Sequence, residues 1–221
     1  MEGAPSGFLL VDKPVGPTSH DIVDAARRVL RTRKIGHAGT LDPFASGLLI
    51  LAVGAKTKEI SKYVGLDKAY EATLRLGATS DTMDRTGAVT EQKDCAPVSR
   101  ETFEKALEGL RGGIDQVPPM YSAKKVGGKK LYELARAGET VERKPVRVTI
   151  HELELVDYAW PVAKIRTRVS SGTYIRALAD DIGKALGCGA YLEELRRTSI
   201  GSFDVKDAVA PDTIDATRLF L

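Results

Sequence analysis

The sequence has few cysteines and no long apolar run, and these absences restrict its class before any motif is considered. Of its 221 residues only Cys95 and Cys188 are cysteine, too few and too far apart along the chain for a disulfide framework or a thiolate metal site. The longest apolar run, Leu48 to Val53, is much shorter than the about 20 residues of a membrane span. Residues 1–7 lack the basic and apolar stretches of a secretory signal. We therefore expect a protein of the reducing cytoplasm without a membrane segment.

The net charge is small, but the basic residues are unevenly distributed. The chain has 33 lysines and arginines against 30 aspartates and glutamates, a formal net charge of +3. The segment 27–37 holds five basic and no acidic residues, and the segment 124–147 holds eight basic and three acidic ones. Such segments suit a polyanion lying across one face. Charge alone slightly favours the simpler interpretation of solvated helix and loop surfaces.

Hydrophobic periodicity predicts interspersed strands and helices without regular βαβ units. Ser19 is the expected N-cap of the first helix, and Gly112 with Gly113 is expected to end the second. The segment 32–46 lacks any period and is predicted to be a loop. Strands are expected at 8–11, 48–53, 70–76, about 146–155 with a bulge, and 163–169, and helices at about 19–30, 99–110, 131–137 and 175–186.

These elements predict the α+β class, with a mixed, mainly antiparallel sheet flanked by helices. No internal repeat, low-complexity tract or composition shift marks a second domain. We therefore expect residues 1–221 to form a single domain, from which the basic segment at about 118–147 projects as an insertion.

The polar loop 36–43, GHAGTLDP, is the most informative stretch of the chain. Gly36 and Gly39 allow the backbone to turn and to approach a ligand closely. Pro43 biases Asp42 away from helix, so that its carboxylate lies on a stiffened loop. On these residues alone, the better interpretation is a turn in which Asp42 caps nearby backbone N–H groups.

Several blocks of the chain together resemble one enzyme family. Residues 36–47, GHAGTLDPFASG, are similar to the catalytic motif of the TruB family, the bacterial tRNA pseudouridine-55 synthases. Further blocks resemble the other motifs of the family in the same order: VDKPVGPTS at 11–19, KAY at 68–70, LG at 76–77 with DTMD at 81–84, PPMYSAK at 118–124, SGTYIR at 171–176 and LRR at 195–197. The resemblance covers the chain from about Phe8 to Phe203.

The resemblance implies the pseudouridine synthase fold and the isomerisation of the T-loop uridine at position 55 of tRNA. The base leaves C1′ through N1, rotates, and reattaches through C5, so neither a cofactor nor a second small molecule is expected. Asp42 matches the catalytic aspartate of the family. Three routes remain open for it, namely attack on the sugar, attack on the base, or a glycal intermediate, and each requires an ionised carboxylate.

The resemblance also assigns roles to two residues beside Asp42. Arg176 matches the arginine that pairs with the catalytic aspartate, and such a charge favours the ionised carboxylate. Tyr70 matches the tyrosine that stacks on the target base, which must be held while it is detached. Without the resemblance, Arg176 is interpreted as a surface arginine on a first helical turn and Tyr70 as a core tyrosine.

The remaining implied site residues hold the substrate. Tyr174 and Leu195 match positions that line the pocket, although an ordinary core leucine explains Leu195 nearly as well. His37 matches the histidine that contacts RNA near the flipped nucleotide. No metal is expected, because the three histidines show no ligand spacing. The remaining motif residues are expected to support loops and turns: Lys13, Pro14, Asp81 and Asp84.

The expected partner is the T-stem–loop of tRNA, bound by a monomer. The basic insertion and residues 33–37 are the expected phosphate-binding surfaces, and binding should weaken as salt rises. The family commonly carries a C-terminal RNA-binding domain of the PUA type, which is not expected within this chain. Two alternatives remain open: a related synthase acting on another RNA or inside a guide-RNA complex, and a non-catalytic RNA-binding or RNA-folding protein. An aspartate retained among phosphate-binding residues argues against the second of these.

Overall fold

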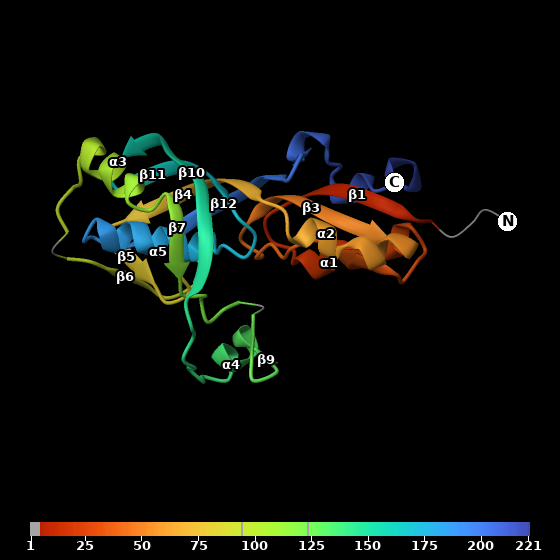
Figure 1. Cartoon of the computed structure of the whole chain (residues 1–221), viewed down its shortest axis with the longest axis horizontal. Helices are drawn as coiled ribbons and strands as arrows, with labels where there is room; N and C mark the ends of the chain where they lie inside the picture. The colour runs from red at the N-terminus through yellow and green to blue at the C-terminus, as the bar shows by residue number, and fades with distance from the viewer. Residues whose placement is uncertain (1–4, 94, 123) are drawn as a thin grey trace. The chain divides into compact units, whose positions relative to one another are not determined.

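The computed structural model describes residues 5–93, 95–122 and 124–221, and the chain divides into two compact units. The first unit comprises Met1–Glu71 with Leu195–Leu221, and the second comprises Ala72–Glu194. Strands β4 (Lys68–Leu76) and β12 (Ala190–Ile200) contribute residues to both units (Figure 1). The predicted mainly antiparallel sheet is confirmed, since most of its strand pairs are antiparallel.

The first unit is built on the antiparallel pair of β1 (Gly7–Lys13) and β3 (Ser46–Val53). Strand β2 (Ile35–His37) pairs with β3 in antiparallel, whereas β12 pairs with β3 in parallel, with Arg197 opposite Gly47. The short strand β13 (Phe203–Asp204) pairs with the end of β12 in antiparallel. The unit is completed by the helices α1 (Ser19–Val29) and α2 (Ser61–Val64) and four 3-10 turns, Gly54–Glu59, Val205–Asp207, Pro211–Thr213 and Ala216–Arg218.

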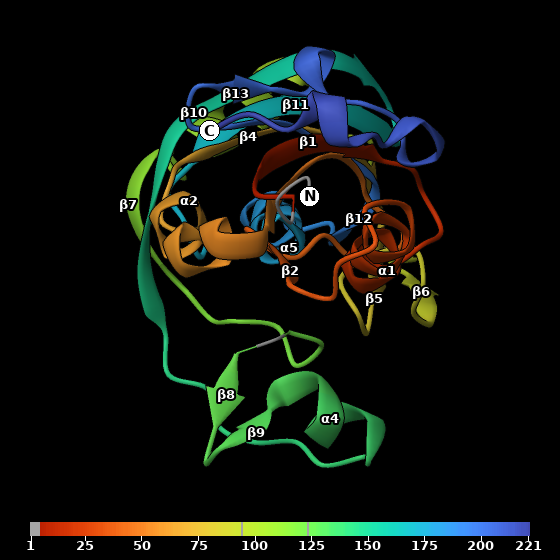
Figure 2. The same cartoon turned by 90° about the vertical axis from the view of Figure 1, so that its right-hand side faces the viewer.

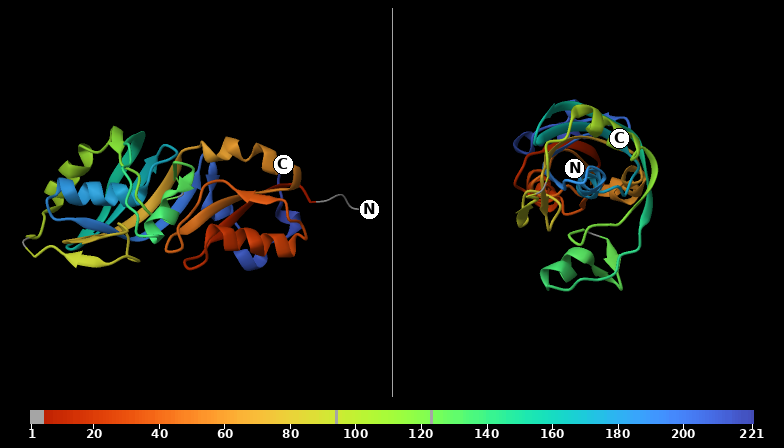
Figure 3. Two further views of the ribbon diagram at one scale, coloured as in Figure 1. Left: turned by 90° about the horizontal axis from the view of Figure 1, so that it is seen from below. Right: turned by 90° about the vertical axis from the view of Figure 1, so that its left-hand side faces the viewer.

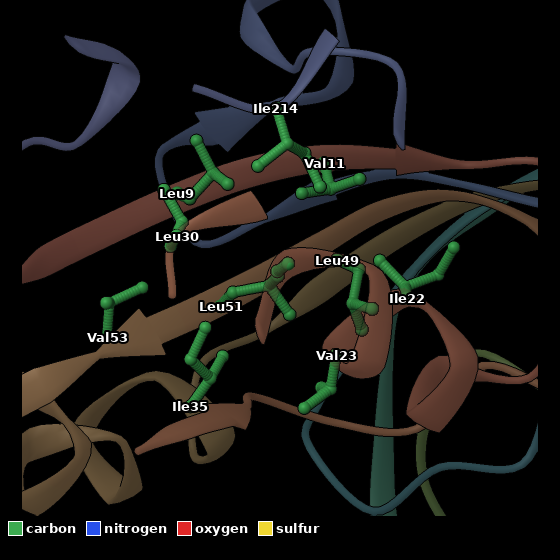
Figure 4. Packing of buried hydrophobic residues seen from close by; sticks show 11 residues of the cluster. Leu9, Val11, Ile22, Val23, Leu30, Ile35, Leu49, Leu51, Val53 and Ile214 are labelled. Atoms are coloured by element: carbon green, nitrogen blue, oxygen red, sulfur yellow. The ribbon is translucent and has the colours of Figure 1, made fainter. Parts of the chain in front are cut away.

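Both faces of the β1–β3 pair are buried, which explains the unbroken apolar run of β3. One face packs against α1 in a cluster that includes Leu9, Leu51, Val23 and Ile214 (Figure 4). The opposite face carries Phe8, Leu48 and Ile50 and is covered by aromatic rings, with Phe8 and Tyr63 centroids 4.4 Å apart. Alternate residues of one strand therefore serve two different apolar clusters.

Helix α1 begins one residue earlier than its sequence suggests. The N-cap is Thr18, whose side chain accepts from the Asp21 N–H while Asp21 accepts from the Thr18 N–H, a reciprocal capping box. The prediction of Ser19 as the N-cap is wrong. The buried Ser19 hydroxyl instead donates to the Leu41 carbonyl (3.0 Å) and accepts from the Leu41 N–H (2.8 Å). It thereby fastens the polar loop next to Asp42.

Glycine is required at position 47 for reasons of both conformation and space. Its φ is +106°, and an added Cβ would collide with the backbone of Arg197 on the paired strand. Gly16 has nearly the same φ, +112°, but an added Cβ would meet no atom within 4 Å.

Gly47→Ala is therefore expected to cost about 1–3 kcal/mol more than Gly16→Ala, because only the first adds a clash to the shared backbone strain. Urea denaturation of the two variants measures the difference. Equal losses of unfolding free energy would show that β3 and β12 can move apart without cost.

In the second unit the strand order is β4–β11–β10–β7, and β10 pairs in antiparallel with both β11 and β7. Strand β10 (Val146–Ala159) pairs with β11 (Val162–Val169), and the register shifts after Ile150 and after Leu155 confirm the predicted bulge. Helix α5 (Ile175–Ala185) buries much of its surface, and α3 (Arg100–Glu108) places Phe103 against Tyr158 of β10 at 5.4 Å between ring centroids. The unit also contains β5 (Ala78–Ser80), β6 (Val89–Glu91) and β7 (Gly112–Gln116).

The basic insertion has regular structure of its own. A hairpin of β8 (Lys125–Val126) and β9 (Lys129–Lys130) leads into α4 (Leu131–Arg136), which confirms the predicted short helix. These elements lie together, apart from the strands of their unit (Figures 2 and 3). The insertion therefore contributes backbone and basic residues away from the core of that unit.

Two sequence predictions about secondary structure were wrong. Strand β2 lies inside the segment predicted to be a loop, because its three residues are too few to show a period. Gly112 and Gly113 do not end α3, which stops at Glu108 with Gly109 as its C-cap, but begin β7. Across residues 5–93, 95–122 and 124–221, no helix has the length and apolar character needed to span a membrane.

Candidate active site

Asp42 lies on a loop between β2 and β3 whose backbone is fixed from several directions. The Ala38 N–H donates to the Ile50 carbonyl (2.9 Å), and the Ala45 N–H donates to the carbonyl of Asp42 itself (3.1 Å). The Gly16 N–H donates to the Pro43 carbonyl (2.8 Å), which ties the motif at 11–19 to the loop. Together with the bonds from Ser19, these contacts hold the residues on both sides of Asp42.

Two buried lysines of the first unit donate to backbone carbonyls beside this loop. Lys13 Nζ donates to the carbonyls of Pro14 (2.9 Å) and Pro17 (2.8 Å), as expected of a supporting residue. Lys68 Nζ donates to the carbonyls of Val64 (3.0 Å) and Leu66 (2.7 Å). Burial lowers the pKa of each lysine to about 8, and the charge of Asp42 partly opposes this shift at Lys13. The loop of Asp42 is therefore set in an electropositive part of the unit.

His37 lies at the end of β2 and is half-buried, and its buried Nδ1 has no hydrogen-bond partner among the described residues. Burial lowers its pKa below the ordinary value of 6.5, and the nearby charge of Arg197 lowers it further. A neutral imidazole suits substrate positioning by hydrogen bonds rather than attraction of phosphate by charge.

The depressed pKa of His37 predicts a loss of stability in acid. Below about pH 6.5 the unfolded chain binds a proton at this position that the folded chain resists, so stability falls and then levels off below the folded pKa. His37→Gln should remove this component. The unfolding free energy of the variant minus that of the parent should therefore increase as the pH is lowered from about 7.5 to 5. Urea titrations across that range measure it, and a difference independent of pH would contradict the assignment.

Tyr70 and Leu195 are the other two predicted site residues in the first unit. Both are buried, with 6% and 8% of their surfaces exposed. Tyr70 belongs to β4 and Leu195 to β12. The expectation that Leu195 also serves as a core leucine agrees with this burial.

Arg176 and Tyr174 lie in the second unit, at the start of α5. The buried Arg176 guanidinium forms an ion pair with Asp84 at 3.3 Å and donates to the carbonyls of Thr82 (3.0 Å) and Tyr121 (2.6 Å). Gln116 of β7 fixes the backbone of Tyr174 by accepting from its N–H (2.8 Å) and donating to its carbonyl (3.1 Å). The first helical turn is thus positioned by β7 and by the turn after β5.

Asp84 braces its turn as predicted. Its buried carboxylate accepts from the hydroxyl of Thr82 (2.9 Å), the N–H of Thr86 (2.9 Å) and the hydroxyl of Thr86. The sequence did not indicate that the same carboxylate also pairs with Arg176. The pairing of Arg176 with Asp42 stays a prediction, since the two residues belong to different units.

Sequence reasoning assigned no role to Arg197 and misassigned Ser19. Arg197 is 1% exposed, and its Nε donates to the Leu48 carbonyl at 2.7 Å. Alternation along β12 offered a signal, because Leu195 and Arg197 are two residues apart and share a face of the strand. No comparable signal reveals the contact of Ser19 with Leu41, which depends on tertiary packing. Within the part of the chain that the structure describes, no three His, Cys, Asp or Glu side chains are grouped to hold a metal ion.

Comparison with known families shows which family the chain belongs to. The model of the TruB family pseudouridylate synthase N-terminal domain matches residues 27–175, and that of the tRNA pseudouridylate synthase B C-terminal domain matches residues 176–220. The chain belongs to the TruB family. The first match contains Asp42 and Tyr70, and the second begins at Arg176.

Similar members of the TruB family cover nearly the whole chain. A tRNA pseudouridine synthase B from Azoarcus sp. (strain BH72) is 53% identical over 211 residues, which are 96% of this chain and 70% of that protein. A tRNA pseudouridine synthase B from Cupriavidus metallidurans is 49% identical over 212 residues, 95% of this chain and 67% of the relative.

Solved structures from larger assemblies share the fold. A chain of a Cbf5-Nop10-Gar1 complex matches with a TM-score of 0.74 and 29% identity over 94% of this chain and 53% of its own length. A chain of an H/ACA RNP bound to a substrate RNA containing 2′-deoxyuridine matches with a TM-score of 0.71 and 26% identity over 94% of this chain and 51% of its own. The TruB-family chain described here thus spans about half the length of those solved chains.

Proposed function

We propose that this chain isomerises the T-loop uridine at position 55 of tRNA to pseudouridine. The observation that carries the proposal is the 53% identity, over 96% of the chain, to a protein named tRNA pseudouridine synthase B. The fixed loop around Asp42 supports it, because a carboxylate carried on a backbone that is held on both sides suits catalysis more than simple capping. The chain is an isomerase of the pseudouridine synthase class.

The reaction is balanced within the nucleoside. The N1–C1′ bond breaks, the base rotates, a C5–C1′ bond forms, C5 loses its proton to solvent, and N1 gains one. No oxidant, reductant or group donor takes part. The residues therefore have to hold the detached base, stabilise charge at the sugar or base, and supply an ionised carboxylate.

Asp42 is the proposed catalytic carboxylate and Arg176 its proposed partner. The nearby charge of Lys13 favours an ionised Asp42, and the proposed pairing with Arg176 would favour it further. Tyr70 is proposed to stack on the uracil, with Tyr174 and Leu195 lining the pocket. His37 is proposed to position the RNA through its neutral imidazole.

A uridine in the folded T-loop is stacked, and turning it out costs a few kcal/mol that contacts to RNA must offset. The proposed phosphate contacts are the basic insertion, which Figure 2 shows as a hairpin and a helix, and residues 33–37. The proposed substrate is therefore a folded stem–loop bound by a monomer of this chain, recognised by shape more than by a long sequence.

The test uses T-stem–loop RNA with tritium at C5 of its uridines. We expect multiple-turnover tritium release, with KM rising steeply between about 50 and 200 mM salt as phosphate contacts are screened. Absence of release by the folded, RNA-binding protein would contradict the proposal. The likeness to the H/ACA chains favours one second candidate function, the isomerisation of a uridine in an RNA other than tRNA. Tritium release from such an RNA, but not from the T-stem–loop, would support this second candidate.

A further inference from the structure

Arg197 is a buried cation for which the proposed reaction has no direct use. Its side chain is among the largest that are fully buried in the described part of the chain. Burying a guanidinium is costly unless its N–H groups are satisfied, so its hydrogen-bond partners indicate what the residue does. Those partners are backbone carbonyls on both sides of Asp42.

The guanidinium connects the two ends of the catalytic loop. Nη2 donates to the Gly39 carbonyl at 3.1 Å, and Nη1 lies 3.5 Å from the Thr40 carbonyl. Nε donates to the Leu48 carbonyl at 2.7 Å, after the loop has entered β3. A guanidinium is a rigid planar fork, so one group fixes the position of residues 39–40 relative to residue 48. Asp42 lies between these anchors.

The backbone of Arg197 is fixed as closely as its side chain. It pairs in parallel with Gly47, the residue next to Leu48, and the absence of a side chain at Gly47 permits this approach. Backbone and side chain of one residue therefore hold consecutive positions of β3. The position of the guanidinium is thus fixed relative to the sheet, because the backbone that carries it is itself paired with β3.

The charge of the same guanidinium is close enough to interact with the Tyr70 side chain. A Cβ built at Gly39 would lie 3.7 Å from Arg197 Nη1 and 3.5 Å from Lys68 Cε, so both cationic side chains lie next to Gly39. The loop of the proposed catalytic carboxylate and the proposed stacking tyrosine therefore both lie next to one rigid guanidinium.

We infer that Arg197 is a positioning residue that holds the Asp42 loop and Tyr70 in one arrangement, so that carboxylate and stacked base meet at a fixed distance. The inference rests on the proposed function for what is positioned, but the ordering of the loop does not depend on it. A displacement of about 1 Å can cost about a hundredfold in rate. Loss of this arrangement should therefore lower the rate constant of the chemical step rather than the affinity for RNA.

The test compares Arg197→Lys and Arg197→Met with a control at the adjacent residue. Lysine keeps the charge but has no planar fork, whereas methionine removes both. Arg196→Lys is the matched control, because the half-buried Arg196 lies on the same strand and its guanidinium binds Asp12 at 2.7 and 3.0 Å. Comparison of the two lysine variants separates loss of the Arg197 fork from general damage to β12.

Single-turnover tritium release with enzyme in excess gives the limiting rate constant and the half-saturating concentration. A fall in the folded fraction lowers neither the limiting rate constant nor the final extent of reaction at saturation. We expect the limiting rate constant to fall about tenfold in Arg197→Lys and about a hundredfold in Arg197→Met, with half-saturation changed less than about twofold. Arg196→Lys should stay within about threefold of the parent in the limiting rate constant.

Hydrogen–deuterium exchange of peptides covering residues 38–46 gives a readout without substrate. Exchange should accelerate in Arg197→Lys and stay at the parent rate in Arg196→Lys. Unchanged limiting rate constants in both Arg197 variants, or unchanged exchange in Arg197→Lys, would overturn the inference and leave Arg197 as a stabilising residue only. If the parent releases no tritium, the proposed function fails, while the exchange rates still decide whether Arg197 orders the loop.

Discussion

Asp42→Asn is expected to abolish tritium release from the T-stem–loop while leaving RNA affinity within about threefold of the parent. The amide keeps the size and hydrogen-bonding shape of the side chain but removes the charge that every proposed route requires. Loss of a catalytic group commonly lowers the rate by about four orders of magnitude or more, so release should fall to background. The loop should keep its structure, because its bonds to Ser19, Gly16 and Ile50 involve backbone atoms.

The measurement pairs tritium release with equilibrium RNA binding for each variant. Asp207→Asn is the control, since it makes the same change at an exposed carboxylate of the first unit. It should retain full activity. Release by Asp42→Asn at more than a few per cent of the parent rate would remove Asp42 from the chemistry and with it the proposed mechanism.

Arg176→Met is expected to destabilise the second unit by about 3–5 kcal/mol as well as to abolish activity. The ion pair between Arg176 and Asp84 is almost fully buried, with side-chain exposures of 6% and 4%. Removing the cation leaves the Asp84 carboxylate buried without it, and this accounts for most of the expected cost. The carbonyls of Thr82 and Tyr121 also lose a donor.

The double variant Arg176→Met with Asp84→Leu separates the two effects. Removing both charges should restore much of the stability, because an apolar pair can replace a buried ion pair at little cost, but it should not restore activity. Lys184→Met is the control on the same helix, where the ion pair with Asp180 at 2.6 Å is exposed at the lysine and should contribute about 1 kcal/mol or less. Urea denaturation followed by circular dichroism measures these variants and Asp84→Leu alone, and additive losses would mean that Arg176 and Asp84 are not coupled.

Local pattern was sufficient for most elements because their residues are close in the chain. Alternation predicted β11, and glycines and prolines marked the polar loop. The prediction failed at Ser19 and at Gly112, where the local preference of a residue and its place in the structure differ. Ser19 is a good N-cap by type, but Thr18 caps the helix and Ser19 is used by a loop 22 positions away.

The motifs in the sequence indicated the family and the candidate site residues, but not the residues that hold those side chains in place. The pairing of Arg176 with Asp42 stays a prediction, and the structure shows Asp84 at the Arg176 guanidinium within the second unit. Asp84 and Arg176 are far apart in sequence, and no spacing rule links a turn residue to the first turn of a later helix. Only the folding of the second unit brings them to 3.3 Å.

By itself the sequence determined the α+β class, the succession of most strands and helices, the TruB family and the candidate residues, because period, capping chemistry and motif are properties of neighbouring residues. The tertiary structure decided which cations are buried and what they bind. Arg197 and Leu48 are 149 positions apart, and whether an arginine is a solvated surface residue or a fixed donor depends on which strands pair. Strand pairing is set by the burial of whole faces, and therefore no single stretch of the chain encodes it.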